Sequence, residues 1–227
     1  MNVLIKQICG RFNEMTPEEI KAHDEEIAKL EEKQAQREKL ERYQKSGVPE
    51  RYFTESLDTY KIKNKMQTTA AKAATNFLHA VKCGEFKSFI IIGNAGTGKT
   101  HLACGIIREA GGQYRTAPEI VEEMRRAKSF TAAETEAEII DYYGRVKLLV
   151  IDEIGRGISA TDEKYMIYQL VNARYNTRKP TVLISNLGKS DFLQYIGVAA
   201  ADRLVESAEI LEMNGESYRR ELRAQNG

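Results

Sequence analysis

Residues Ser88 to Leu102 read S-F-I-I-I-G-N-A-G-T-G-K-T-H-L. The stretch begins with an apolar run, Phe89 to Ile92, that does not alternate with polar residues. Such a run is typical of a strand buried on both faces of a parallel sheet. Residues Gly93 to Thr100 then match the phosphate-loop pattern of glycine, four residues, glycine, lysine and threonine, and a helical segment follows. The stretch therefore predicts a strand, a phosphate-binding loop and a helix in succession.

The residue types of this loop suit the binding of a nucleoside triphosphate. Glycines let backbone N–H groups turn toward phosphate oxygens, at the start of a helix that favours negative charge. Lys99 is predicted to reach the β and γ phosphates, and Thr100 to place its hydroxyl on Mg²⁺. The predicted nucleotide-binding residues are Gly93, Asn94, Ala95, Gly96, Thr97, Gly98, Lys99, Thr100 and His101.

Composition excludes several other classes of protein. The chain has 227 residues and a formal net charge of +1, so any contact with nucleic acid or an anionic membrane must come from a local patch. Cys9, Cys83 and Cys104 form no C-x-x-C pair, which argues against a disulfide framework or a zinc site. We expect a cytoplasmic protein, because there is neither a signal peptide nor an apolar run long enough to cross a bilayer.

The first part of the chain predicts a long, highly charged helix. Thr16 to Glu19 form a capping box with proline at the first helical position, and roughly half of the residues from there to Ser46 are charged. Such a helix has too few apolar positions to build a core. It is either a solvated helix or short coiled coil, or a docking arm for a partner protein. Gly47 and Pro49 end it, so we predict an arm over residues 1–47 and a second domain over residues 48–227.

The second domain alternates helices and buried strands. A helix is expected from Met66 to Lys82 and another from the phosphate loop to about Ala110. The aromatic loop before them holds Tyr52 and Phe53, which either contact the base or belong to the core. Further strands are expected at residues 113–115, 147–152, 181–185 and 209–213. Thr161 is expected to cap a helix that precedes the strand at 181–185.

Three polar residues follow these later strands. Asp152 at the end of a parallel strand beside the phosphate loop is placed to hold Mg²⁺ through Thr100 or water. Glu153 can orient and deprotonate the attacking water. Asn186 can hold that water or sense the γ phosphate. These residues predict hydrolysis as well as binding.

Several arginines and their neighbours are candidates for charged contacts. Arg203 and Arg219 either supply positive charge to a nucleotide or lie on the surface. Between two expected capping boxes, at residues 116–119 and 131–134, the chain combines positive charge with an aromatic ring. That combination suits single-stranded nucleic acid, although basic residues are often merely solvated. The candidates are Arg125, Arg126, Lys128 and Phe130.

Together these motifs resemble the AAA+ ATPases, and within them the DnaC-type helicase loaders and their IstB relatives. The resemblance covers residues 48–220 and rests on five stretches of sequence. They are G-N-A-G-T-G-K-T-H-L-A from Gly93, L-L-V-I-D-E-I-G from Leu148, R-K-P-T-V-L-I-S-N ending at Asn186, A-D-R-L around Arg203, and S-Y-R from Ser217 to Arg219.

The resemblance implies an α/β P-loop NTPase, a three-layer sandwich with a parallel sheet of strand order 5-1-4-3-2 and a reduced C-terminal lid. Lys99 and Thr100 would be Walker A, Asp152 and Glu153 Walker B, and Asn186 sensor 1. Arg203 would be an arginine finger offered to a neighbouring subunit, and Arg219 sensor 2. The helices between the second and third strands would face single-stranded DNA.

The resemblance also implies a function, ATP-dependent loading of a DnaB-type hexameric helicase onto single-stranded DNA by self-associating ATPase bodies that use ATP and Mg²⁺. Two alternatives stay open. One is an IstB-like transposition helper that assembles on duplex DNA, and the other is a nucleotide-gated adaptor without useful turnover. A GTPase is disfavoured, since no N-K-x-D guanine-reading motif occurs.

Overall fold

The structure, a computed structural model, describes residues 16–129, 131–157, 159–218 and 220. The chain separates into two compact units, Met1–Arg42 and Tyr43–Gly227. Tyr43 and Ser46 are buried in the second unit together with Val48, the residue at which the second domain was predicted to begin. The second unit carries the phosphate loop and is called the body below.

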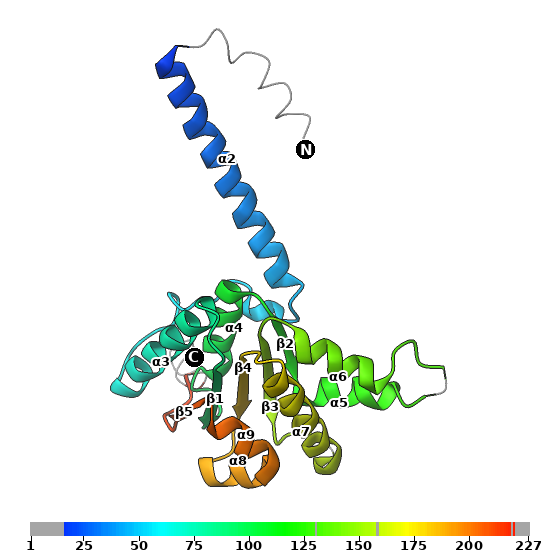
Figure 1. Cartoon of the computed structure of the whole chain (residues 1–227). Coiled ribbons are helices and arrows are strands. Elements are labelled where there is room, and N and C mark those ends of the chain that lie inside the picture. Colours follow the sequence, from blue (N-terminus) through cyan, green and yellow to red (C-terminus); the bar gives the residue numbers. More distant parts are fainter. Residues whose placement is uncertain (1–15, 130, 158, 219, 221–227) are drawn as a thin grey trace. The chain divides into compact units, whose positions relative to one another are not determined.

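The body is built on a parallel five-stranded sheet (Figure 1). Its strands are β1 (Ser88–Gly93), β2 (Gln113–Thr116), β3 (Leu149–Ile154), β4 (Thr181–Ser185) and β5 (Ala208–Met213). They lie in the order β2-β3-β4-β1-β5, and every neighbouring pair is parallel. This confirms the expected order 5-1-4-3-2. All residues of β1 are buried, as its apolar run predicts.

Helices cover both faces of this sheet, which completes the three layers. Alternate residues of β1 point to opposite faces, because side chains along a strand alternate. Phe89 packs with Phe77 of α3 in one core cluster, and Ile90 packs with Ile120 of α5 in the other. The first cluster includes α3 (Lys65–Lys82) and α4 (Lys99–Ala110), and the second α5 (Ala117–Arg126), α6 (Glu136–Arg145), α7 (Ala160–Asn176), α8 (Lys189–Ile196) and α9 (Val198–Val205).

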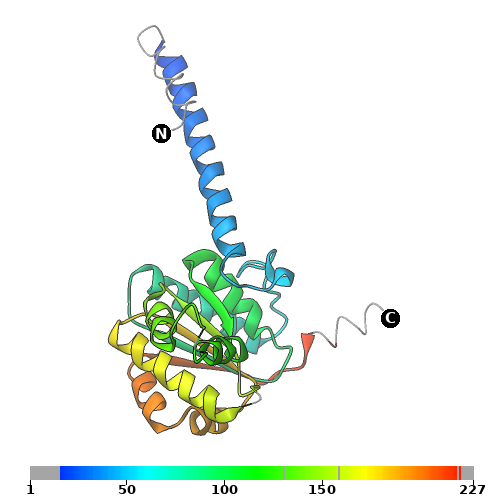
Figure 2. The same ribbon diagram turned by 90° about the vertical axis from the view of Figure 1, so that its right-hand side faces the viewer.

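In the described part of the first unit the chain forms one long helix, α2 (Pro17–Gln44) (Figures 1 and 2). Side-chain hydrogen bonds at the i, i+4 spacing support it, such as Gln34 Nε2 to Glu38 Oε1 at 3.0 Å. Leu30 and Leu40 are 48% and 42% exposed. In the part of the chain that the structure describes, none of the helices is both long enough and apolar enough to cross a membrane.

Three local predictions need correction. Helix α6 starts from a capping box at Thr135 and not at the expected Thr131. Both positions match T-x-x-E, but only the later start places Ile139 and Tyr143 one and two turns on, where both are buried. Helix α7 is capped by Ser159 instead of Thr161. Strand β3 continues beyond the expected end at Asp152 to Ile154, and α8 was not predicted.

Candidate nucleotide-binding site

The loop between β1 and α4 follows a path that only glycine tolerates at two points. Gly96 and Gly98 have φ of 82° and 100°, in the left-handed region. A Cβ at Gly96 would lie 2.1 Å from the Ser217 hydroxyl, and one at Gly98 would lie 2.8 Å from the Tyr60 ring. Helix α4 begins directly afterwards, so the positive end of its dipole faces the loop, and no side chain caps its first N–H groups.

Lys99 places a positive charge inside this loop. Its side chain is nearly buried, and Nζ donates to the carbonyl oxygens of Gly93 at 2.8 Å and Asn94 at 2.6 Å. The residue thus lies where backbone N–H groups and the helix dipole also favour an anion. The loop has the chemistry of a phosphate site before any ligand is considered.

One pocket of about 550 Å³ gathers most of the predicted site residues. Gly93 and Asn94 are not among its lining residues, but their carbonyl oxygens accept hydrogen bonds from Lys99. The predicted residues that line the pocket are Ala95, Gly96, Thr97, Gly98, Lys99, Thr100, His101, Asp152, Glu153 and Asn186. The sheet topology thus joins the phosphate loop with the ends of β3 and β4.

Thr100 and Asp152 bring two side-chain oxygens together in this pocket. The Thr100 hydroxyl donates to Asp152 Oδ2 at 2.8 Å, and the same oxygen accepts from the Tyr114 hydroxyl at 2.7 Å. A hydroxyl and a carboxylate are hard oxygen ligands, which Mg²⁺ prefers. Mg²⁺ commonly takes only one or two protein ligands beside substrate phosphates, so these two side chains fit it.

Tyr114 is a site residue that the sequence did not reveal. Burial, and then the nearby Asp152 carboxylate, raise the pKa of Tyr114 far above its ordinary value, so the phenol remains a proton donor. Its strand was predicted, but the role of its hydroxyl depends on the pairing of β2 with β3. Other lining residues missed by sequence reasoning include Thr59, Gln67, Arg156 and Tyr218.

Glu153 stands beside Asp152 in an unusual backbone conformation. Its φ is 60°, which is uncommon for a residue other than glycine and is often found at functional sites. Its side chain is 45% exposed, and Oε1 lies 3.8 Å from Arg156 NH1. The carboxylate is therefore accessible to water at the pocket while Asp152 is held inside. Ser185 donates to the Ile154 carbonyl at 2.7 Å, which ties the end of β4, and with it Asn186, to the end of β3.

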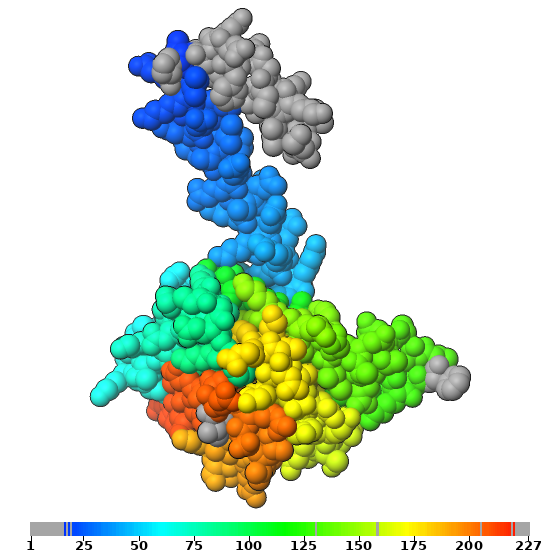
Figure 3. Space-filling model, in the orientation of Figure 1, coloured from blue at the N-terminus to red at the C-terminus, as the bar shows by residue number. Residues whose placement is uncertain are grey.

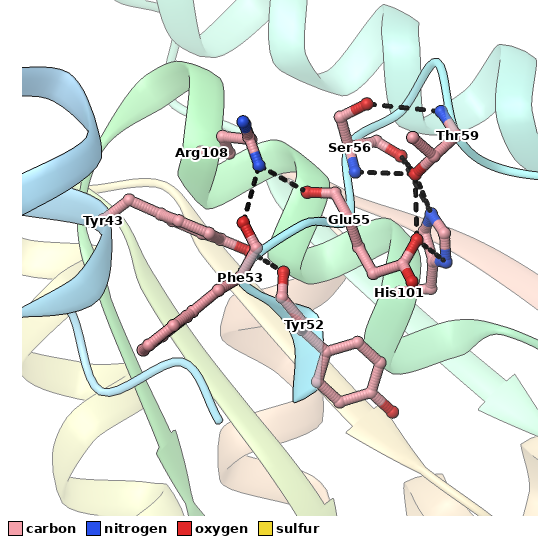
Figure 4. A network of polar contacts seen from close by, with 8 residues as sticks. All are labelled: Tyr43, Tyr52, Phe53, Glu55, Ser56, Thr59, His101 and Arg108. Carbon is pink, nitrogen blue, oxygen red and sulfur yellow. Dashed lines mark hydrogen bonds and ion pairs between the residues drawn. The ribbon is translucent and has the colours of Figure 1, made fainter. Parts of the chain in front are cut away.

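A wall of the pocket comes from residues 50–60, which precede α3 and are held onto α4 by side-chain contacts (Figure 4). The His101 ring contacts the Ser56 carbonyl at 2.8 Å and Glu55 Oε2 at 3.3 Å. Arg108 donates to the Phe53 carbonyl at 2.8 Å. The two aromatics considered for base contact are both partly buried against the core, and of the two only Tyr52 also lines the pocket. The Phe53 ring contacts the Tyr43 ring edge to face.

We expect His101→Ala to weaken ATP binding about fivefold to tenfold, since the wall loses hydrogen bonds that are each worth about 1 kcal/mol. The measurement is a titration with a fluorescent ATP analogue. His79→Ala is the matched control, because His79 is an exposed histidine on α3 that does not line the pocket. Equal affinities for the two variants would contradict a positioning role for His101.

Arg203 is not among the residues that line the pocket of its own chain. Its Nε donates to Asn172 Oδ1 at 2.8 Å, NH1 donates to the Ala199 carbonyl, and the guanidinium lies 5.5 Å from the centre of the Tyr168 ring. These contacts hold the side chain on the surface of α7 and α9. Its predicted role toward a neighbouring subunit stays a prediction, and Arg219 lies outside the described residues.

The basic candidates for nucleic-acid contact lie at and just after the end of α5. Helices α5 and α6 form the green lobe that projects from the body in Figure 3. Arg125 donates to Asp162 at 2.6 Å, and that hydrogen bond lowers the pKa of Asp162. Arg126 pairs with Glu122 and Lys128 with Glu136. Exposed pairs of this kind are weak enough to exchange for phosphate. Phe130 lies outside the described residues, and DNA contact here stays a prediction.

Comparison with known proteins now identifies the family. The model of a family described as IstB-like ATP binding protein matches residues 21–226. This chain belongs to the AAA+ ATPases of the DnaC and IstB-like group. Family membership and the pocket together make it an ATP-binding protein.

Individual relatives agree with this assignment. The replicative helicase loader DnaC of Buchnera aphidicola from Schizaphis graminum is 30% identical over 190 residues, 79% of this chain and 75% of that protein. DnaC of Escherichia coli K12 is 27% identical over 78% of this chain and 74% of its own. A crystal structure of the DnaC helicase loader has a TM-score of 0.65 at 22% identity, covering 73% of this chain and 100% of the other. The last likeness concerns the fold alone.

Proposed function

We propose that this protein is an ATPase that loads a replicative hexameric helicase onto single-stranded DNA. The observation that carries the proposal is the pocket that brings the phosphate loop together with Asp152 and Glu153, in a chain whose similar relatives are named replicative helicase loaders. Helix α2, with its exposed leucines, is the proposed docking element for the helicase.

We assign a separate role in ATP hydrolysis to each group of residues in the pocket. The glycine-rich loop and Lys99 bind and orient the phosphates. Thr100 and Asp152 would hold Mg²⁺, which when bound neutralises charge on the phosphate oxygens. Glu153 accepts the proton of the attacking water, and Asn186 orients that water. Arg203 of a neighbouring protomer and Arg219 of the same protomer are proposed to stabilise the charge that develops on the transferred phosphoryl group.

A transposition helper is the second candidate, favoured by the family description as IstB-like. Such a helper would assemble on duplex DNA without any contact with a helicase. The nucleotide-gated adaptor differs from both in lacking useful turnover. The three functions share the nucleotide pocket, so they must be separated by partners and by rate.

Docking of a helicase through α2 is tested by co-purification with candidate hexameric helicases in the presence of ATP. We expect the full chain to retain the helicase and the double variant Leu30→Asp, Leu40→Asp to lose at least tenfold in affinity, because exposed apolar anchors typically carry a helix interface. Ala35→Asp is the matched control, because Ala35 is an exposed residue of the same helix and lies on the side opposite Leu30 and Leu40. Stable binding of duplex DNA, with no helicase retained by the full chain, would favour the transposition helper instead.

A further inference from the structure

The Asp152 carboxylate is held by three donors from three segments of the body. Oδ1 accepts from the backbone N–H of Glu153 at 2.6 Å. Oδ2 accepts from the Thr100 hydroxyl and from the Tyr114 hydroxyl, at 2.8 Å and 2.7 Å. Thr100 belongs to the phosphate loop and Tyr114 to the edge strand β2. Asp152 as a whole is 5% exposed, so the orientation of its carboxylate depends on these donors more than on water.

Register explains why Tyr114 reaches this oxygen. Tyr114 is paired with Val150 across β2 and β3, and Asp152 is two residues further along β3 on the same face. A diagonal neighbour on an adjacent strand lies about 7–8 Å away between backbones, within the reach of a phenol. The ring is 3% exposed and packs in the core cluster beneath α4.

The backbone of Tyr114 is itself fixed from the outer side of the sheet. Its N–H donates to the Ser46 carbonyl at 2.7 Å. Gly47 follows with φ of 85°, and a Cβ there would lie 2.4 Å from the Tyr114 carbonyl oxygen. Ser46 and Gly47 therefore contact the edge strand β2 at the backbone of Tyr114. Tyr114 is thus held both at its backbone, by Ser46, and at its hydroxyl, by Asp152.

We propose that Tyr114 is a positioning residue that orients the Asp152 carboxylate for the metal ion of the nucleotide site. The proposal rests on the proposed function only in requiring that this pocket bind ATP with Mg²⁺. Residues that orient metal ligands by hydrogen bonding typically change metal affinity or activity about 10-fold to 100-fold when removed. The competing interpretation is that Tyr114 is a core tyrosine whose hydroxyl merely finds a buried acceptor.

Tyr114→Phe separates these interpretations, because it removes the hydroxyl and keeps the packed ring. The probe is a fluorescent ATP analogue, titrated with the full-length protein at a series of Mg²⁺ concentrations and in EDTA. We expect the Mg²⁺ concentration for half-maximal tightening to rise about tenfold. Affinity in EDTA should stay within twofold of wild type. Direct titration of Mn²⁺ in the presence of ADP, followed by electron paramagnetic resonance, should show the same weakening.

Tyr143→Phe is a closely matched control. Tyr143 is 2% exposed, and its hydroxyl donates to a carboxylate, Glu123 Oε2, at 2.7 Å. That carboxylate is not part of the pocket, so this variant should keep the wild-type dependence on Mg²⁺. An unchanged Mg²⁺ midpoint in Tyr114→Phe would overturn the proposal. An equal loss of affinity with metal and in EDTA would overturn it too, since a purely structural defect acts on both.

Failure of the proposed loader function would give other results in these experiments than failure of the role proposed for Tyr114. If the wild-type chain binds the analogue equally with Mg²⁺ and with EDTA, the pocket is not a metal–nucleotide site, and the role of Tyr114 is overturned with it. If no helicase is retained but Tyr114→Phe shifts the Mg²⁺ midpoint, the loader function fails while the positioning role holds.

Discussion

Glu153→Gln is expected to lower the rate of ATP hydrolysis about 10²-fold to 10⁴-fold, because an amide cannot accept the proton of the attacking water. Binding of ATP should stay close to wild type, since the phosphate loop, Lys99 and Asp152 are unchanged. The measurement is phosphate release in the presence of single-stranded DNA and the helicase, together with a nucleotide titration. These two readouts separate a chemical role from a binding role.

Glu85→Gln is a suitable control, since Glu85 is an exposed glutamate outside the pocket and away from the candidates for DNA contact. That variant should keep full activity. If wild type and Glu153→Gln release phosphate at the same rate, the pocket does not hydrolyse ATP usefully. The adaptor function would then be the better description of this protein.

Relative to wild type, Arg203→Ala is expected to lower the rate of ATP hydrolysis about 10³-fold to 10⁵-fold, because the guanidinium is proposed to complete the pocket of a neighbouring protomer. Nucleotide binding by a single chain should be unaffected, because Arg203 does not line its own pocket. The existing contacts with Asn172 and Tyr168 suit such a role, since they hold the side chain in place on the surface.

Mixing two inactive variants tests the shared pocket directly. Glu153→Gln keeps its arginine and Arg203→Ala keeps its glutamate, so one class of mixed interface has both groups intact. We expect activity to return on mixing, although each variant alone is inactive. Asn172→Ala removes only one of the contacts that hold Arg203, so it should lower activity far less than Arg203→Ala. A mixture that remains inactive while both variants bind ATP and self-associate would contradict action between protomers.

Much of the fold followed from local pattern. The strand, loop and helix around Gly96 lie within one continuous stretch, and their geometry depends on glycines and apolar runs that are visible in the sequence. Strand β4 has the expected bounds, and α3 and α4 match closely. The strand order came from the family resemblance, because no local pattern states which parallel strands are neighbours.

The wrong start predicted for α6 has the same cause, since a local pattern does not specify which side chains meet in the folded body. Thr131 and Thr135 satisfy the capping-box pattern equally, and the choice depends on which helix start buries Ile139 and Tyr143 against the rest of the body. The acidic residues that pair with the basic candidates for DNA contact could not be predicted for a similar reason. Arg125 meets Asp162, which is 37 residues away in the chain, only because α5 and α7 lie on the same face of the sheet.

By itself, the sequence predicted a phosphate site at Gly93 to Thr100 and carboxylates for metal and water at Asp152 and Glu153, because each motif is a short run with its own chemistry. Only the tertiary structure decided that Tyr114 reaches Asp152 and that His101 fastens the wall before α3. The physical reason is that these contacts join side chains from separate elements, and their distances are set by strand register and helix packing.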